Sequence, residues 1–118
     1  MSYSIPNRRC YPITAVADVS SIKGPKGKTG RLVEIHVAAT TTFTAGSIKI
    51  GTGSDDDAYA SFSFGTLADT DSASTLDAVT DTDAIINENI PADTQVEVTY
   101  ANGGAGAGPA MVVIDWAD

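Results

Sequence analysis

Residues 31–37, Arg-Leu-Val-Glu-Ile-His-Val, alternate between apolar and polar side chains with a period of two. In an extended chain this period puts the apolar side chains on one face and the polar ones on the other. The two faces carry Val33, Ile35 and Val37 against Glu34 and His36. Most of the apolar residues are β-branched and Gly30 stands just before the run, so a half-buried β-strand is favoured over a helix.

Four later segments repeat this alternation, at residues 47–50, 58–64, 95–100 and 110–116. The side chains expected to face the core are Ile48, Ile50, Ala60, Phe62, Phe64, Val96, Val98, Tyr100, Val112, Ile114 and Trp116. Residues 43–46 are typical of a turn. The glycine-rich loop at 102–109 is expected to reverse the chain, so that the last two strands form an antiparallel hairpin.

Counting the segments gives about six to eight short strands, separated by turns, without a convincing long helix. This pattern predicts an all-β fold: an antiparallel two-sheet β-sandwich, jelly-roll-like. A chain of 118 residues is one domain by length, and we assign residues 30–118 to the sandwich. Residues 68–83 hold few large apolar side chains, which predicts a long surface loop or a poorly paired edge segment.

Residues 1–29 are expected to form an extended N-terminal arm that ends in a basic loop. Pro6, Pro12 and Pro25 interrupt this segment. Apolar residues recur every three positions from Ile13 to Ile22, a spacing that leaves a short helix and an irregular strand both open. The basic loop is either a solvated connection or a contact element for an acidic partner.

Charge is divided unevenly along the chain. The formal net charge is −8, yet all seven basic residues lie in residues 1–49, where the balance is +5, and residues 50–118 carry −13. A basic segment on an acidic body can dock against an acidic surface, including that of a neighbouring copy, whereas nucleic acid would repel the acidic body. No segment has the length of a signal peptide or a membrane span, and Cys10 alone forms no intrachain disulfide. We therefore expect folding in the cytosol.

Residues that could carry chemistry are few. His36 is the only histidine, has no catalytic motif around it and is expected to be exposed or at an interface, and Cys10 is expected to be a small, half-buried residue. Asp55, Asp56 and Asp57 form one acidic run, and Asp69, Asp71, Asp81 and Asp83 form another. Neither has EF-hand spacing, so each is a solvated loop or at most a weak cation site. We expect no catalytic residues, no metal ligands and no cofactor.

Three segments resemble small structural proteins of tailed bacteriophage heads: residues 23–33, residues 48–64 with Gly-Thr-Gly-Ser-Asp-Asp-Asp-Ala-Tyr-Ala, and residues 90–94 before an alternating strand. The resemblance lies in a sequence rich in Ala, Gly, Thr and Asp. It implies a capsid decoration, or cement, protein on the outer surface of the virion. Such a protein is a virion structural protein that binds an assembled capsid and bridges neighbouring major capsid subunits.

The resemblance further implies synthesis in the host cytoplasm, the major capsid protein as partner, and a homo-oligomer, dimer or trimer. We expect the contacts with capsid or sister subunit to come from Arg8, Arg9, Lys23, Lys26 and Lys28. Neither nucleic acid nor a membrane is an expected partner. The alternatives are a head-fibre or tail-associated domain and a carbohydrate-binding β-sandwich module. A hydrolase that uses Asp55 and Asp57 is the remaining option.

Overall fold

The computed structural model describes residues 7–13, 18–75 and 84–117. Within these residues the chain forms nine strands and no helix. Their bounds are β1 Asn7–Ile13, β2 Asp18–Lys23, β3 Thr29–Ala38, β4 Phe43–Gly51, β5 Ala60–Leu67, β6 Ser72–Ser74, β7 Asn89–Ile90, β8 Gln95–Ala101 and β9 Ala110–Ala117. The described residues contain no helix that is long and apolar enough to span a membrane.

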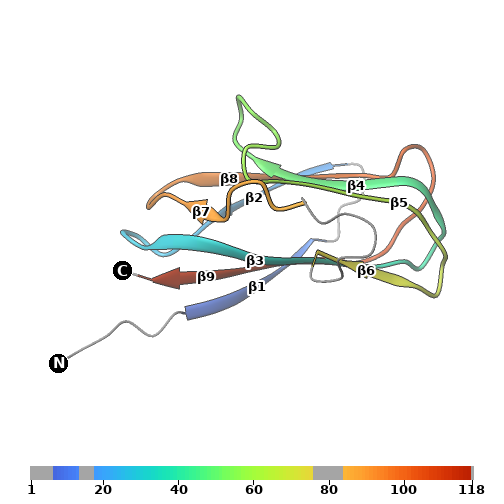
Figure 1. Cartoon of the computed structure of the whole chain (residues 1–118), viewed down its shortest axis with the longest axis horizontal. Coiled ribbons are helices and arrows are strands. Elements are labelled where there is room, and N and C mark those ends of the chain that lie inside the picture. The colour runs from blue at the N-terminus through green and yellow to red at the C-terminus, as the bar shows by residue number, and fades with distance from the viewer. Residues whose placement is uncertain (1–6, 14–17, 76–83, 118) are drawn as a thin grey trace.

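The strands form two antiparallel sheets that pack together as the two layers of a sandwich (Figure 1). The five-stranded sheet has the order β1-β9-β3-β6, with β7 also paired to β3, and the four-stranded sheet has the order β2-β8-β4-β5. The predicted all-β, two-sheet sandwich is confirmed.

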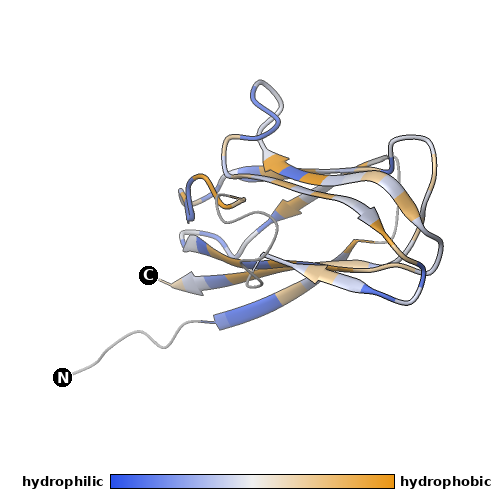
Figure 2. Ribbon diagram, turned by 45° about the vertical axis from the view of Figure 1, so that its right-hand side comes forward, coloured by the Kyte–Doolittle hydropathy of each residue, from blue (hydrophilic) through white to orange (hydrophobic). Residues whose placement is uncertain are grey.

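The core lies between the two sheets and is built from the alternating segments. Every side chain that the alternation in residues 47–50, 58–64, 95–100 and 110–116 assigned to the core is buried. Phe43 joins them, with its ring edge-on to Phe64 at a centroid distance of 4.9 Å and stacked on Tyr100 at 6.1 Å. Figure 2 shows apolar colour along the strands of both layers, and polar colour in loops and at the start of β1.

Strand β3 differs from its predicted pattern at one residue. Ile35 and Val37 are fully buried as expected, but Leu32 takes the next core position and Val33 is only half-buried. The register against β9 shifts between Leu32 and Glu34, because Val33 is an extra residue in a β-bulge. The prediction for Val33 is therefore wrong.

The predicted hairpin between the last two strands is also wrong. β8 pairs with β2 and β4, whereas β9 pairs with β1 and β3 in the other sheet. The loop at 102–109 crosses between the sheets, and its end is held by a bond of 2.7 Å that Tyr100 Oη donates to Gly108 O. Two strands facing each other across a core alternate just as two strands of a hairpin do, so the pattern alone cannot separate these arrangements.

The N-terminal segment is built into the sandwich rather than forming a separate arm. β1 pairs with β9 and β2 pairs with β8, each at the edge of its sheet. Ile13 and Ile22 are 3% and 4% exposed and pack into the core, whereas Val19 between them is 52% exposed. Pro12 has no backbone N–H, and an edge strand tolerates that loss. The arm is thus not confirmed over residues 7–13 and 18–23, while residues 1–6 and 14–17 lie outside the described residues.

Two smaller expectations have different outcomes. The turn predicted at residues 43–46 is the start of β4, whose register against β5 is irregular on both sides of Gly46. The segment at 68–83 was predicted to be a long surface loop or a poorly paired edge segment. It contains the short edge strand β6, which pairs with β3 and agrees with the second of these predictions. Residues 76–83 lie outside the described residues.

Candidate interaction surfaces

The turn from β2 to β3 carries three of the predicted contact residues at one end of the sandwich (Figure 1). Lys23 and Lys26 are exposed and Lys28 is half-buried. Lys28 N donates to Pro25 O at 3.1 Å, and Gly27 N donates to Asp93 Oδ1 at 3.0 Å. We call residues 23–28 the lysine turn. Because its backbone is bonded to itself and to the loop before β8, the turn holds its lysines in a defined place.

Trp116 fixes the start of this turn against the core. A Cβ atom added to Gly24 would lie 2.5 Å from Trp116 Cη2, and one added to Gly30 would lie 2.6 Å from Trp116 Cζ3. The indole Nε1 donates to Tyr11 Oη at 2.8 Å. Only glycine leaves room for the ring at these two positions, so the sequence at 24 and 30 follows directly from the packing of Trp116.

Arg8, a fourth predicted contact residue, is paired within the chain. Its Nε and Nη2 donate to the two carboxylate oxygens of Asp115 at 2.7 and 3.0 Å. The hydrogen bond from Arg8 holds the pKa of Asp115 below its ordinary value, and the bond to Asp115 raises the pKa of Arg8. Arg9, the fifth, is exposed and forms no ion pair within the described part of the chain.

Arg8 belongs to a line of alternating charges across the five-stranded sheet. In the strand register Asp115 stands opposite Arg8 on one side and opposite Arg31 on the other. Arg31 Nε donates to Glu88 Oε2 at 3.2 Å. We call Arg8, Asp115, Arg31 and Glu88 the charge row. Asp115 and Arg31 also line a hollow of about 330 Å³ beside β7.

The sequence and the fold were compared with those of known proteins. No protein-family model, curated protein or solved structure matches this chain. Its function therefore has to be inferred from its own residues.

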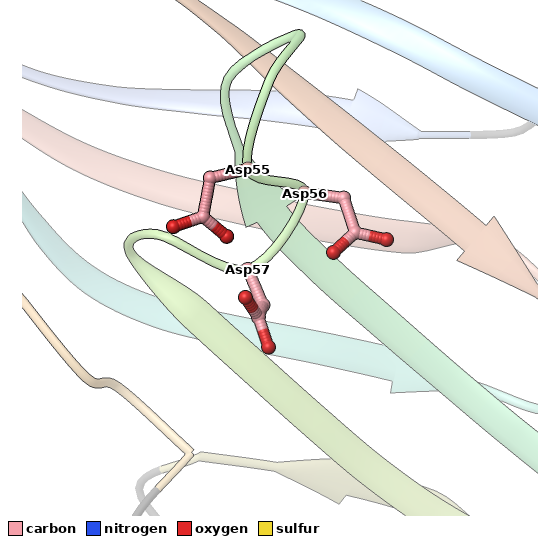
Figure 3. A group of neighbouring side chains, drawn as sticks. All are labelled: Asp55, Asp56 and Asp57. Atoms are coloured by element: carbon pink, nitrogen blue, oxygen red, sulfur yellow. The ribbon is translucent and has the colours of Figure 1, made fainter.

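The acidic run in the loop from β4 to β5 brings three carboxylates together (Figure 3). Asp55, Asp56 and Asp57 offer oxygen atoms that all lie within 4.8 Å of one another. Lys49 Nζ lies 3.8 Å from Asp56 Oδ2 and offsets part of this charge. The loop is closed by its own bonds, among them Thr52 N to Asp55 O at 2.8 Å. Such a loop fits both interpretations from the sequence, a solvated acidic loop and a weak cation site.

The second acidic run is only partly described. Asp69 and Asp71 lie in the connection between β5 and β6, where the backbone oxygen of Asp71 accepts a bond from Ala39 N at 2.9 Å. Asp81 and Asp83 lie outside the described residues. Among the residues that the structure describes, the only cluster of three or more possible metal ligands is the one at 55–57.

His36 lies on the outer face of β3 and lines a shallow apolar hollow. The hollow has a volume of about 290 Å³ and is lined by Pro12, His36, Ala38, Pro109, Ala110 and Met111. His36 Nε2 is buried and has no hydrogen-bond partner among the described residues. Cys10, expected to be half-buried, is exposed because β1 is an edge strand and nothing covers this position.

Sequence reasoning missed the hollow and the charge row. Both join residues from separate parts of the chain. Arg8 had been expected at a contact and His36 exposed or at an interface, but their neighbours had not been identified. A signal was present in β9, where Met111 and Val113 occupy the phase opposite Val112 and Ile114. Apolar residues on both phases of one strand indicate that both faces of that strand are covered.

Proposed function

We propose that this chain is a virion structural protein of a tailed bacteriophage, which binds the outer surface of the assembled capsid and bridges neighbouring major capsid subunits. It is synthesised in the host cytoplasm and acts on the virion without catalysing a reaction. The small β-sandwich supports this proposal, because a decoration protein needs a rigid body with contact surfaces and gains strength from many copies.

We further propose that the sandwich is jelly-roll-like. The strand order supports this part of the proposal. With the two-residue β7 set aside, the positions in one sheet, β1-β9-β3-β6, match the positions in the other, β2-β8-β4-β5. Consecutive strands therefore alternate between layers for most of the chain, as expected of paired Greek keys.

The observation that carries the proposed contact is the lysine turn. Lys23 and Lys26 are exposed, and neither forms an ion pair with a described residue, although the chain as a whole carries a net charge of −8. A tethered basic turn on an acidic body is suited to an acidic site on the major capsid protein. Arg9 lies on β1 near the same end of the sandwich, whereas Arg8 is already paired with Asp115.

The test is co-sedimentation of the purified chain with empty heads at increasing salt. Replacing Lys23, Lys26 and Lys28 together by alanine is expected to abolish binding at moderate ionic strength and to flatten its salt dependence. A matched pair is Lys26→Glu against Lys49→Glu, since each changes the charge equally but Lys49 lies on the outer face of the four-stranded sheet. Equal binding by the two single variants would refute the lysine turn as the contact.

The carbohydrate-binding alternative has less support. Sugar sites are normally lined by Trp, Tyr or Phe side chains, and the two hollows described above contain none of these. A head-fibre or tail-associated role uses the same kind of body and differs in its partner. Binding to tails or fibres without binding to heads would favour that role, and a shift in gel filtration on adding a glycan would favour the sugar module.

A further inference from the structure

The outer face of the five-stranded sheet is divided into two halves. Among the described elements, none covers the side of this sheet that is turned away from the core (Figure 1). One half carries the charge row, and the other carries the apolar hollow around His36. Val113 lies between them on this face and is only 5% exposed, although it does not belong to the core cluster. Glu34 stands opposite Val113 in the strand register and is half-buried on the same face, where Ser74 Oγ donates to its Oε2 at 2.6 Å. The face therefore combines apolar side chains with charges that are paired or hydrogen-bonded within the chain.

A polar atom on this face lacks a partner. His36 Nε2 is buried at the edge of the hollow and makes no hydrogen bond to a described residue. Buried polar atoms without a partner are uncommon, because the lost hydration is not replaced. Because the nitrogen is buried within one chain, it indicates a solvent-excluded hollow rather than a hydrogen-bonding site for a second molecule.

The order of signs in the charge row identifies the second molecule. In the strand register the row reads positive, negative, positive, from Arg8 through Asp115 to Arg31. The ion pair of Arg31 with Glu88, the residue before β7, adds a negative charge at the end of the row. Read in the opposite direction, the same row has the opposite sign at every position. A two-fold axis in the plane of the face reverses the row, so an identical copy presents a complementary charge to each member.

We propose that the outer face of the five-stranded sheet is an interface with a second copy of this chain, related by a two-fold axis that runs parallel to the strands between β9 and β3. Arg8 then faces Glu88 of the second copy, and Asp115 faces its Arg31. Because the axis parallels the strands, positions along them are kept, and the apolar half meets the apolar half. His36 comes to lie over Met111 of the second copy, a favourable pairing of an aromatic ring with a thioether.

The size of the face sets the strength of this contact. Four strands spaced about 4.8 Å apart, with about eight residues at 3.4 Å each, cover roughly 500 Å² per copy. Both copies together bury roughly 1,000 Å², the lower limit for a specific interface. We accordingly expect a weak dimer. Elsewhere on the surface the net charge of −8 per chain opposes association.

The first test is sedimentation velocity of the full chain over a concentration series. We expect a monomer–dimer equilibrium, and Met111→Asp is expected to raise the dissociation constant at least about tenfold. Thr99→Asp is the matched control, because Thr99 is equally half-buried on the outer face of a central strand in the other sheet. It should leave the equilibrium unchanged. A wild-type chain that stays monomeric, forms a trimer, or ignores Met111→Asp overturns the proposal.

A second pair of variants separates contact between copies from support within one chain. Arg8→Glu places like charges opposite each other across the interface and is expected to weaken the dimer. Adding Glu88→Arg makes the row negative, negative, positive, positive, which is again complementary to its own reversal. The double variant is thus expected to dimerise more tightly than Arg8→Glu. If these charges act only within one chain, the double variant should instead dimerise more weakly than Arg8→Glu, because like charges become neighbours in the row. That result would overturn the proposal.

This inference does not depend on capsid binding. The lysine turn lies at the end of the sandwich, outside the face that the dimer buries. Loss of co-sedimentation in the lysine variants with an unchanged dimer, or the reverse, therefore distinguishes failure of one proposal from failure of the other.

Discussion

The two sheets share one core but present different outer faces. On the four-stranded sheet the residues that alternate with the core are mostly small or polar, among them Ser21, Ser47, Ser61, Lys49 and Thr99. The exception is Val19, which stands opposite Thr99 and is 52% exposed. On the five-stranded sheet the equivalent positions include Met111 and Val113, together with the paired charges of Arg8 and Asp115. The outer face of the four-stranded sheet thus carries mainly the small and polar side chains expected on a sheet surface in contact with solvent. The outer face of the five-stranded sheet shows that a sandwich strand can carry apolar side chains on its outer phase as well as on its inner one.

The largest effect that separates the two faces is expected from an aspartate placed on each. Val113→Asp puts a carboxylate at a position only 5% exposed and should lower the free energy of unfolding by about 3 kcal/mol. Thr99→Asp lies on the half-buried outer face of β8, near Lys49, and should cost no more than about 0.5 kcal/mol. Urea denaturation measures both. Similar losses would show that the two faces do not differ.

A smaller effect concerns the contact between Trp116 and glycine. Gly30→Ala brings a methyl group 2.6 Å from Trp116 Cζ3 and should cost about 1–3 kcal/mol through overpacking. Gly53→Ala is the control, since its nearest contact would be Glu97 Oε1 at 3.8 Å. Thermal unfolding followed by tryptophan fluorescence reports on both. A stable Gly30→Ala variant with an unchanged emission spectrum would contradict the packing described here.

Each sheet also contributes to one limb of the pH profile of stability, and Tyr100 in the four-stranded sheet contributes to the alkaline limb. Burial raises the pKa of Tyr100 to about 12. Because the folded pKa lies above the ordinary value of 10.0, the stability it contributes is present below about pH 10 and is lost as the pH rises towards 12. Tyr100→Phe should cost about 1 kcal/mol near neutrality by leaving Gly108 O unbonded, and should shift alkaline unfolding upward.

The smallest effect is expected in the acid limb, from Arg8 and Asp115 in the five-stranded sheet. The folded pKa of Asp115 lies below its ordinary value of 3.8, so its contribution is present above that pH and is lost as the pH falls through the folded pKa. Arg8→Gln should raise the pKa of Asp115, with only a slight loss of stability at pH 7 because the arginine is exposed. Carboxyl NMR titration measures the shift. An unchanged titration would refute the pairing.

Much of the sandwich could be predicted from local alternation. The core side chains of β5, β8 and β9 were identified from a period of two, because burial on one face is recorded residue by residue in the sequence. Val33 was misassigned because a bulge adds one residue without leaving a local signal. The crossing between β8 and β9 was missed because an antiparallel neighbour and a facing strand impose the same alternation.

The candidate surfaces were harder to predict, because they depend on which strands become neighbours. Arg8 and Asp115 are 107 residues apart, and nothing local indicates their pairing. The lysine turn was found, since its residues are adjacent in sequence and its glycines and proline are typical of a turn. Residues 7–13 were taken for an arm because their charge and proline content resemble those of an exposed segment, yet an edge strand permits both.

The central place of β9 between β1 and β3 has a consequence for biosynthesis. At common translation rates, roughly 5 to 20 seconds separate the emergence of Arg8 from that of Asp115. Throughout that interval the earliest strand has no neighbour to pair with, and its sheet cannot close. The five-stranded sheet of a nascent chain can be completed only after its last strand has emerged, and any truncation that removes β9 leaves β1 and β3 without the strand they share.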